Sequence, residues 1–418
     1  AAKALSAQEI QREMLNDDTV LLEYSLGEKR SFVFVLDQQS IRVVQLAGQA
    51  RIEQAARRMH RSVAAYGDST LQGMNTLEDA VQQAVFNLSR LVLSPIPSDW
   101  LRKRILVVPD GALEYVPFTA LVRPAARGLA VGAPLVSAHE VVNLPSASSV
   151  AALRDRKTPE TAFSGAVAVL ADPVFELNDS RLRTRPEKTQ KATEVQRREA
   201  GLVSLSDGTP PLTRSAVDFG LARNMNINLR RLPGTRREAR EILSLSLRSK
   251  AALDFDASRA TAMSPELSRY GIVHFATHGL LNSQHPELSG LVFSLVDKNG
   301  NAQNGFLQLQ DIYNMNLPAD LVVLSACETG LGKEISGEGL VGLTRGFMYA
   351  GASRVVASLW KVSDAATAEL MQRFYRGMLQ EHLSPPAALR QAQISMWKQK
   401  RWHSPYFWAA FQIQGDWN

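Results

Sequence analysis

From about residue 232 to its C-terminus, the chain alternates short apolar runs with amphipathic stretches. The apolar runs lie at 251–255, 272–276, 321–326, 354–359 and 407–413, and the helical patterns lie at 235–247, 265–270, 340–350, 364–379 and 386–398. Strands that alternate with helices form a mostly parallel sheet that is covered by helices on both faces. The pattern therefore predicts an α/β fold, to which the apolar run Ala166–Leu170 contributes a further strand.

The first part of the chain shows a different order of elements. A short helix is expected within residues 1–18, followed by three strand-like runs at 20–24, 31–36 and 41–46 that indicate an antiparallel meander. Helical periodicity covers 51–66 and 76–93, and further strands are expected at 104–108 and 140–144. We therefore predict an N-terminal helix at 1–18 that is the end of a longer upstream region, a first α/β domain at 19–160 and a second at 161–418.

A polar, basic stretch at about 176–230 interrupts the second domain and is interpreted as an inserted loop. Order is expected to resume at Thr235, which we predict to be a helix N-cap with Glu238 three residues later completing a capping box. The net charge of +6 would suit nucleic acid, but much of the excess lies in this one segment. A solvated basic loop explains it, so no direct contact with nucleic acid is expected.

Composition also excludes several classes of protein. One cysteine excludes an internal disulfide and fits a reducing compartment, and the seven histidines show no metal-binding spacing, so we expect neither a metal nor another cofactor. No apolar run approaches the ~20 residues that cross a bilayer. The first fifteen residues lack the apolar core of a signal peptide, which predicts a cytoplasmic protein.

The single cysteine, Cys327, follows one apolar run, and His278 follows another. Each run is expected to end at its polar residue, with a glycine turn after it. Because adjacent parallel strands end on the same side of a sheet, the thiol and the imidazole can meet at one rim as a nucleophile and its base. The amides of Gly279 and Cys327 are placed to form an oxyanion hole. The alternative is that Cys327 is a buried structural cysteine.

Two neighbouring features are assigned other roles. His274 lies inside its strand, where we expect a buried histidine with satisfied hydrogen bonds, whereas His278 is expected to be exposed at the rim. The glycine-rich segment 330–339 lacks the order of residues found in a phosphate-binding loop and is expected to shape a substrate groove.

At these residues the chain resembles the CHAT domain, a branch of the caspase-like cysteine peptidases related to separase. The matching segments are HFATHG at 274–279, SACETG at 325–330, GEGL at 337–340, GA at 351–352 and SLWKV at 358–362, with VPDG at 108–111, VPF at 116–118, LPS at 144–146 and LADP at 170–173 upstream. The similarity extends from about residue 20 to the C-terminus. Glu328 and Thr329 depart from the narrower caspase signature, so a preference for aspartate is not expected.

The resemblance implies a caspase-like, mostly parallel six-stranded sheet sandwiched by helices and preceded by a pseudo-peptidase-like α/β domain. It implies His278 and Cys327 as the catalytic dyad, with Gly279 assisting at the oxyanion. It also implies a frequent upstream neighbour, an array of tetratricopeptide repeats or another regulatory region, although no such repeat is visible here. Relatives include peptidases of bacterial defence and cell-death pathways, some of which cut gasdermin-like proteins.

In this fold, the pocket for the residue before the cut lies beside the first strand and the strand that follows the nucleophile. We therefore assign substrate binding to Asp172, Ser358, Trp360 and Asp364, and to Glu328 beside the nucleophile. A buried carboxylate at Asp172 would select arginine or lysine. The alternatives are that Asp172 caps a turn, Trp360 packs in the core and Asp364 caps the next helix.

The sequence therefore predicts a cysteine endopeptidase that cleaves a specific protein partner. The alternative is a catalytically silent CHAT module that binds partners as a signalling scaffold. The two hypotheses differ in the ionisation of the thiol, because a catalytic cysteine beside a histidine ionises more easily than a free one.

Overall fold

The computed structural model describes residues 4–67, 74–123, 132–155, 165–182, 229–282, 286–325, 327–331 and 338–418. For residues 74–75, 282, 286, 327–331 and 338 it describes the backbone alone. Most of the predicted insert at 176–230, the predicted domain boundary near 160 and much of the glycine-rich segment 330–339 lie outside the described residues.

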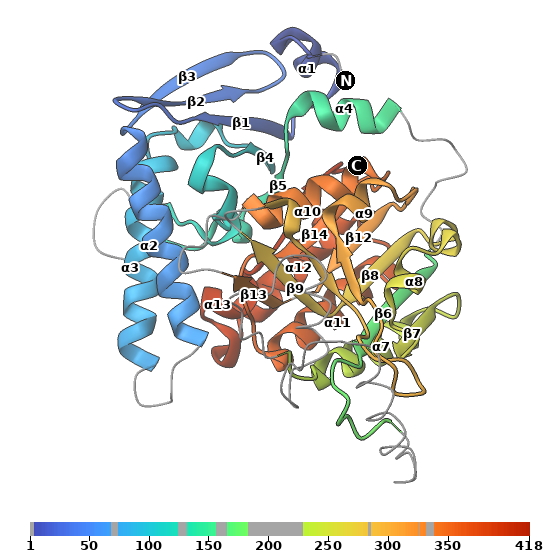
Figure 1. Cartoon of the computed structure of the whole chain (residues 1–418). Coiled ribbons are helices and arrows are strands. Elements are labelled where there is room, and N and C mark those ends of the chain that lie inside the picture. Colours follow the sequence, from blue (N-terminus) through green and yellow to red (C-terminus); the bar gives the residue numbers. More distant parts are fainter. Residues whose placement is uncertain are drawn as a thin grey trace.

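Six strands form the C-terminal half of the main sheet (Figure 1). In spatial order they are β7 (Lys250–Asp254), β6 (Val167–Pro173), β8 (Ile272–Ala276), β12 (Leu321–Leu324), β14 (Arg354–Ser358) and β15 (Phe411–Gly415). All neighbouring pairs are parallel except β14 and β15. The strands β6, β8, β12 and β14 are buried along their whole length, as central strands covered on both faces must be. The predicted mostly parallel six-stranded sheet is confirmed.

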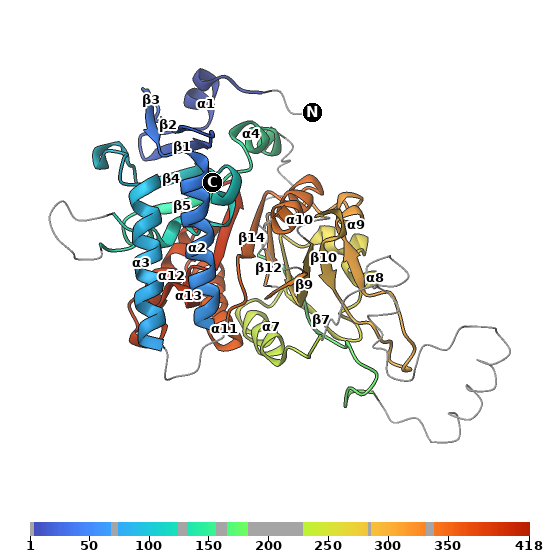
Figure 2. The ribbon, with the colours of Figure 1, turned by 60° about the vertical axis from the view of Figure 1, so that its left-hand side comes forward.

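Helices cover both faces of this half of the sheet (Figure 2). On one face, α7 (Pro233–Leu245), α11 (Asp364–Leu379) and α12 (Pro385–Trp397) pack in one core cluster with alternate strand residues such as Val169 and Val323. On the other face, α8 (Arg259–Ala262), α9 (Leu309–Tyr313) and α10 (Glu338–Tyr349) join a second cluster with the intervening residues, such as Leu170 and Val322. The period of two along each strand thus separates the two cores.

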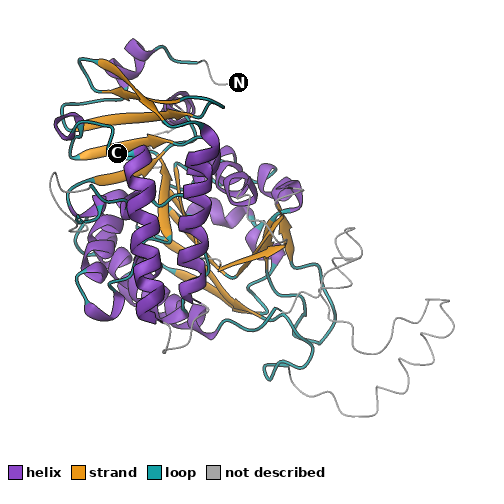
Figure 3. Cartoon of the chain, turned by 90° about the vertical axis from the view of Figure 1, so that its left-hand side faces the viewer, coloured by secondary structure: helices purple, strands orange, loops and turns teal. Residues whose placement is uncertain are grey.

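Five further strands form the N-terminal half of the sheet. They are β1 (Thr19–Ser25), β2 (Ser31–Leu36), β3 (Ile41–Leu46), β4 (Arg104–Val108) and β5 (Glu140–Asn143). The antiparallel pairs β1–β2 and β2–β3 form the predicted meander, whereas β4 is parallel to β1 and β5. The two long helices α2 (Gln49–Gly67) and α3 (Met74–Val92) pack against each other across this half (Figure 3). The shorter helices are α1 (Ala7–Glu13), α4 (Ala147–Asp155) and α13 (Pro405–Trp408).

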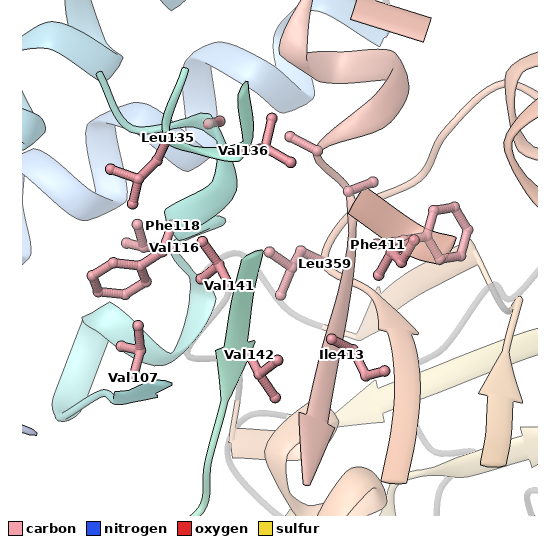
Figure 4. Packing of buried hydrophobic residues seen from close by; sticks show 14 of the residues in the cluster. Val107, Val116, Phe118, Leu135, Val136, Val141, Val142, Leu359, Phe411 and Ile413 are labelled. Carbon is pink, nitrogen blue, oxygen red and sulfur yellow. The ribbon is translucent and has the colours of Figure 1, made fainter. Parts of the chain in front are cut away.

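The two halves join in one eleven-stranded sheet. The complete order is β3-β2-β1-β4-β5-β15-β14-β12-β8-β6-β7, and the junction pairs Asn143 of β5 with Gln414 of β15 in parallel. Figure 4 shows Val142 of β5 on the side of Ile413 of β15, and Val141 on the opposite side, near Val116 and Phe118. Leu359 and Phe411 lie further along the junction. These residues belong to one core cluster, so the hydrophobic core is continuous from one half to the other.

A second, four-stranded sheet stands beyond the carboxyl ends of β8 and β12. Its order is β11 (Phe306–Gln308), β10 (Gly290–Val292), β9 (His278–Asn282) and β13 (Cys327–Leu331). The sequence predicted a glycine turn after each of the two central strands, and this prediction was wrong. After Thr277 the chain enters β9, and β13 follows β12 in the same way, because each segment finds a hydrogen-bonding partner in the other.

Two predictions for local structure also need correction. The helix expected within residues 1–18 spans only Ala7–Glu13, where a Ser6–Glu9 capping box begins it. The capping box predicted for Thr235 and Glu238 is absent: α7 begins at Pro233 with Leu232 as N-cap, and the Thr235 hydroxyl donates to the Leu232 carbonyl at 2.7 Å. Proline is well suited to the first helical position, which moves the start two residues earlier. None of the helices in the described ranges is both long enough and apolar enough to cross a membrane.

Candidate active site

His278 is the first residue of β9 and is held by the backbone of a distant segment. Its Nε2 lies 2.7 Å from the carbonyl oxygen of Arg230, so Nε2 carries the proton and donates it. In the neutral imidazole, Nδ1 is then the acceptor, and this atom is buried without a hydrogen-bond partner among the described residues. His278 is only 5% exposed, and its ring centroid lies 5.0 Å from that of Phe175. The prediction that His278 is exposed at the rim was therefore wrong.

The surroundings of His278 favour the neutral imidazole. Burial is the largest influence and lowers the pKa of His278 below the ordinary 6.5, and the charge of Lys361 lowers it further. The bond to the Arg230 carbonyl and the charge of Asp364 act in the opposite direction without overcoming burial. His278 is therefore neutral at pH 7, with a lone pair on Nδ1 available to accept a proton.

Cys327 is the first residue of β13, and its backbone pairs with that of His278. The strands β9 and β13 are parallel, with Cys327 opposite His278 and Glu328 opposite Gly279. Neighbouring strands lie about 4.8 Å apart. The two backbone positions of the predicted dyad are thus adjacent, whereas the side chains of Cys327 and Glu328 lie outside the description.

Gly279 lies within β9 between two partner strands. It pairs with Leu291 of β10 on one side and with Glu328 of β13 on the other. It therefore occupies a strand and not the expected turn. Its predicted role at the oxyanion remains a prediction.

Asp172 lies at the carboxyl end of β6, fully buried beneath three arginines. Arg231 binds it with both Nε (2.9 Å) and Nη2 (2.7 Å), Arg236 Nε lies 2.5 Å from Oδ2, and Arg181 Nη1 lies 3.2 Å from Oδ1. Such paired contacts from guanidinium to carboxylate are the geometry in which arginine binds most strongly. Asp172 therefore lies at the centre of a cluster of guanidinium groups, and its predicted role in substrate binding remains a prediction.

Asp254, at the end of the adjacent strand β7, belongs to the same cluster. It accepts hydrogen bonds from Arg181 (2.7 Å) and Arg236, and Asp179 binds Arg181 (2.6 Å). Bonds from Arg181 and Arg236 outweigh burial and lower the pKa of Asp254. The sequence did not identify either partner carboxylate, because only the parallel register brings β6 and β7 together.

The backbone is unusual at the carboxyl ends of both β6 and β7. Asp172 has φ 51° and Asp254 has φ 55°, in the left-handed region that non-glycine residues rarely adopt. The ladder between β6 and β7 shifts register at this point. Strained residues of this kind persist where the surrounding contacts fix them, and they are common at functional sites. Asp172 is thus the next-to-last residue of β6, and its carboxylate belongs to the cluster with Asp179 and Asp254.

Asp364 is the first residue of α11 but not its cap. Ser363 is the N-cap, with its hydroxyl accepting from the Ala366 amide at 3.3 Å, which corrects the capping alternative for Asp364. The Asp364 carboxylate instead accepts from the Gly234 amide of α7 at 3.3 Å. A side chain at position 234 would collide with it, because a Cβ there would lie 2.5 Å from the Asp364 Cβ.

Ser358 and Trp360 are buried, so their side chains are not available to line a substrate pocket. The Trp360 side chain is 2% exposed and its indole nitrogen donates to the Tyr406 carbonyl at 3.0 Å, which is a packing position. The Ser358 hydroxyl donates to the Trp360 carbonyl at 2.7 Å. Both side chains shape the turn after β14, so a substrate could meet this segment only through its backbone.

A row of buried polar side chains lies next to the site, and the sequence did not predict it. It consists of Ser325, Glu238, His274 and Tyr375. Glu238 of α7 is 2% exposed; its Oε2 accepts from the Ser325 hydroxyl at 3.1 Å, and its Oε1 lies 3.1 Å from His274 Nε2. His274 Nδ1 lies 2.9 Å from the Tyr375 hydroxyl. Burial, together with the charge of Glu238, raises the pKa of Tyr375. The sequence contained a signal for the burial of Glu238, because this residue falls on the same helical face as Ala239 and Ile242, which are buried in the core.

The described residues contain no group of three or more His, Cys, Asp or Glu side chains arranged to hold a metal ion. The described residues instead include a neutral histidine, a cysteine whose backbone pairs with it, and a cluster of aspartates and arginines around Asp172.

The chain is similar to proteins of a known family. The family model of the CHAT domain matches residues 82–416. Tetratricopeptide repeat protein 28 is 34% identical over 114 residues in Homo sapiens and 35% over 110 residues in Mus musculus, which is 27% and 26% of this chain and 4% of each relative. The chain thus spans a small fraction of those relatives.

Among solved structures, separase in the separase–securin complex of Saccharomyces cerevisiae is similar over 98% of this chain and 30% of its own, with a TM-score of 0.53 and 9% sequence identity. At that identity the similarity concerns the fold.

Proposed function

The chain belongs to the CHAT domain family of caspase-like cysteine peptidases, and on this premise we propose that it is a cysteine endopeptidase with Cys327 and His278 as its dyad. One observation carries the proposal: the parallel register of β9 and β13 sets Cys327 opposite His278. Paired residues on adjacent strands project to the same face of a sheet, which brings a thiol and an imidazole within reach of each other.

The environment of His278 supports its role as the base. The Arg230 carbonyl fixes the proton on Nε2, and the low pKa keeps Nδ1 unprotonated. In the proposed reaction Nδ1 accepts the thiol proton, the sulfur attacks the carbonyl carbon of the scissile peptide, and the protonated imidazole donates to the leaving amine. Water then releases the acyl group from Cys327. The amides of Gly279 and Cys327 would stabilise the oxyanion, each donor contributing about 10²–10³ in rate.

The cluster of Asp172, Asp179 and Asp254 supports a preference for arginine before the cut. Asp172 already binds Arg231 in paired geometry, so a substrate arginine that replaced Arg231 would meet a carboxylate of matching charge and shape. Asp364 and the backbone of Ser358–Trp360 lie on the α11 side, where extended substrate would pass, and Glu328 flanks the nucleophile. A specific protein is the proposed substrate; a gasdermin-like protein and a role in bacterial defence or cell death are the forms that the family resemblance suggests.

The decisive test compares the native protein with Cys327→Ala on fluorogenic peptides that vary at the residue before the cut. We expect cleavage after arginine by the native protein and none by the variant, with equal thermal unfolding of both. Cleavage retained in the variant would refute the proposal.

The reactivity of the thiol separates the peptidase from the silent scaffold. The rate of iodoacetamide labelling against pH should give a Cys327 pKa below the ordinary value of about 8.5. His278→Gln is the matched variant and should return the value to the ordinary range. An ordinary value in the native protein, together with no turnover, would favour a scaffold that binds partners through the same groove.

A further inference from the structure

The segment Leu229–Leu232, here called the strap, contacts both halves of the proposed active site. We propose that Asp172, Asp179 and Asp254 form a pocket for arginine, and that the strap is its internal ligand, with Arg231 in the place of a substrate arginine. The strap then keeps the peptidase latent until the side chain of Arg231 is displaced, while the Arg230 carbonyl continues to hold His278. This inference rests on the proposed function and concerns its regulation.

Three successive residues of the strap anchor it. Leu229 is 4% exposed and packs with Phe175 and Leu280 in a small core cluster beside the site. The Arg230 carbonyl accepts from His278 Nε2 at 2.7 Å. Arg231 reaches Asp172 with two nitrogens. The strap thus occupies the proposed base and the proposed specificity pocket at the same time.

The charges in the pocket balance only when Arg231 is present. The carboxylates of Asp172, Asp179 and Asp254 face the guanidinium groups of Arg181, Arg231 and Arg236. Without Arg231, three negative groups face two positive ones. The withdrawal of the Arg231 side chain would therefore leave one negative charge uncompensated, which favours the binding of a new guanidinium group.

Of the three arginines, Arg231 is the one that can leave at the lowest cost. Its side chain is 39% exposed, against 14% for Arg181 and 23% for Arg236. Arg181 is also bound to Asp179, Asp254 and the carbonyls of Asp172 and Pro173, and Arg236 lies in the first turn of α7. Arg231 lies outside any helix or strand, and Asp172 is its ion-pair partner in the described part of the chain.

The far end of the strap is held by the next residues. The Leu232 carbonyl accepts from the Thr235 hydroxyl, and the Gly234 amide donates to Asp364. Asp364 therefore serves as a fixed point for the strap where it enters α7. A substrate that follows the proposed path would compete with this contact as well as with Arg231.

A binding measurement tests the strap without requiring turnover. Benzamidine is the probe, since its amidinium group resembles a guanidinium, and Cys327→Ala is the background, so that no chemistry intervenes. If the strap fills the pocket in most molecules, Arg231→Ala should raise the affinity for benzamidine about tenfold or more, because the pocket becomes available in every molecule. The matched control is Arg237→Ala, which removes an exposed arginine of α7 that pairs with Glu241, and its affinity should equal that of the background.

Turnover supplies the second readout. With Cys327 present, Arg231→Ala should lower the KM for an arginine-containing fluorogenic peptide about tenfold with a smaller change in kcat. Arg231→Lys keeps the charge without the paired geometry and should fall between the native protein and Arg231→Ala, which also covers the case in which Arg231→Ala does not fold.

The outcomes separate the two proposals. Unchanged benzamidine affinity in folded Arg231 variants overturns the strap, whatever the activity. Tighter benzamidine binding in a protein that never cleaves a peptide supports the strap and overturns the peptidase.

Discussion

The buried side chain of Glu238 supports the site from below, and its removal has consequences that the structure allows to be estimated. Glu238→Ala takes the acceptor from the Ser325 hydroxyl. It also removes the carboxylate oxygen that lies 3.1 Å from Nε2 of the fully buried His274, although that nitrogen makes no hydrogen bond among the described residues. Leaving a buried polar group unsatisfied costs about 1–3 kcal/mol. With one such group, the Ser325 hydroxyl, and the loss of buried methylene, we expect the free energy of unfolding to fall by about 2–4 kcal/mol.

Two further variants make this estimate specific. Glu238→Gln keeps the shape and one carbonyl acceptor, so it should cost about 1–2 kcal/mol. Glu241→Ala removes a carboxylate from the same helix that pairs with the exposed Arg237, and it should cost no more than about 1 kcal/mol.

Urea unfolding followed by tryptophan fluorescence measures all three, with the midpoint compared at constant slope. The reasoning is refuted if Glu238→Ala unfolds within about 1 kcal/mol of the native protein. A cost in Glu238→Gln equal to that of Glu238→Ala would show that the charge, and not the hydrogen-bond acceptor, is what this row of buried side chains requires.

Two further predictions concern ionisation and the C-terminal strand. The NMR signal that His278→Gln removes should titrate below pH 6.5. The unfolded chain binds this proton at a higher pH than the folded chain does. The contribution of neutral His278 to stability is therefore present above about pH 6.5 and is lost as the pH falls through the pKa of His278 in the folded protein. A titration midpoint at or above pH 6.5 would contradict the lowered pKa. Arg354 is 2% exposed and binds Asp320 at 2.6 Å and the Asp416 carbonyl at 2.8 Å, so Arg354→Met should lower the free energy of unfolding by about 3–5 kcal/mol. The control Arg58→Met, at an exposed position of α2, should leave the urea midpoint unchanged.

The sequence predicted the strands and helices of the C-terminal half well, because their periodicity is a local property of the chain. Runs such as Ile272–Ala276 and Leu321–Leu324 are apolar throughout, and a strand covered on both faces requires that composition. The N-terminal meander is predictable for the same reason. The join of the two halves through β5 and β15 was not predicted, since it depends on the pairing of residues 143 and 414, far apart in sequence.

Charged residues show why the site was predicted only in part. Arg181 was counted in a solvated basic loop, yet its side chain is 14% exposed and bound to three carboxylates. Glu238 was interpreted as a capping residue, because a glutamate three positions after a threonine fits that motif. In both cases the sequence states the charge, whereas burial depends on segments that meet only in the folded chain.

The helix α7 connects these observations physically. Arg236 in the first turn of α7 binds Asp172. The helix follows directly after the strap, whose Arg230 carbonyl binds His278. Two residues after Arg236 along the helix, Glu238 binds Ser325, which lies two residues before Cys327. A movement of α7 that releases Arg231 would therefore also act on the backbone that presents the cysteine. This geometry predicts that Glu238→Gln alters the iodoacetamide reactivity of Cys327 and the benzamidine affinity together; a change in one alone would show that the pocket and the nucleophile are adjusted separately.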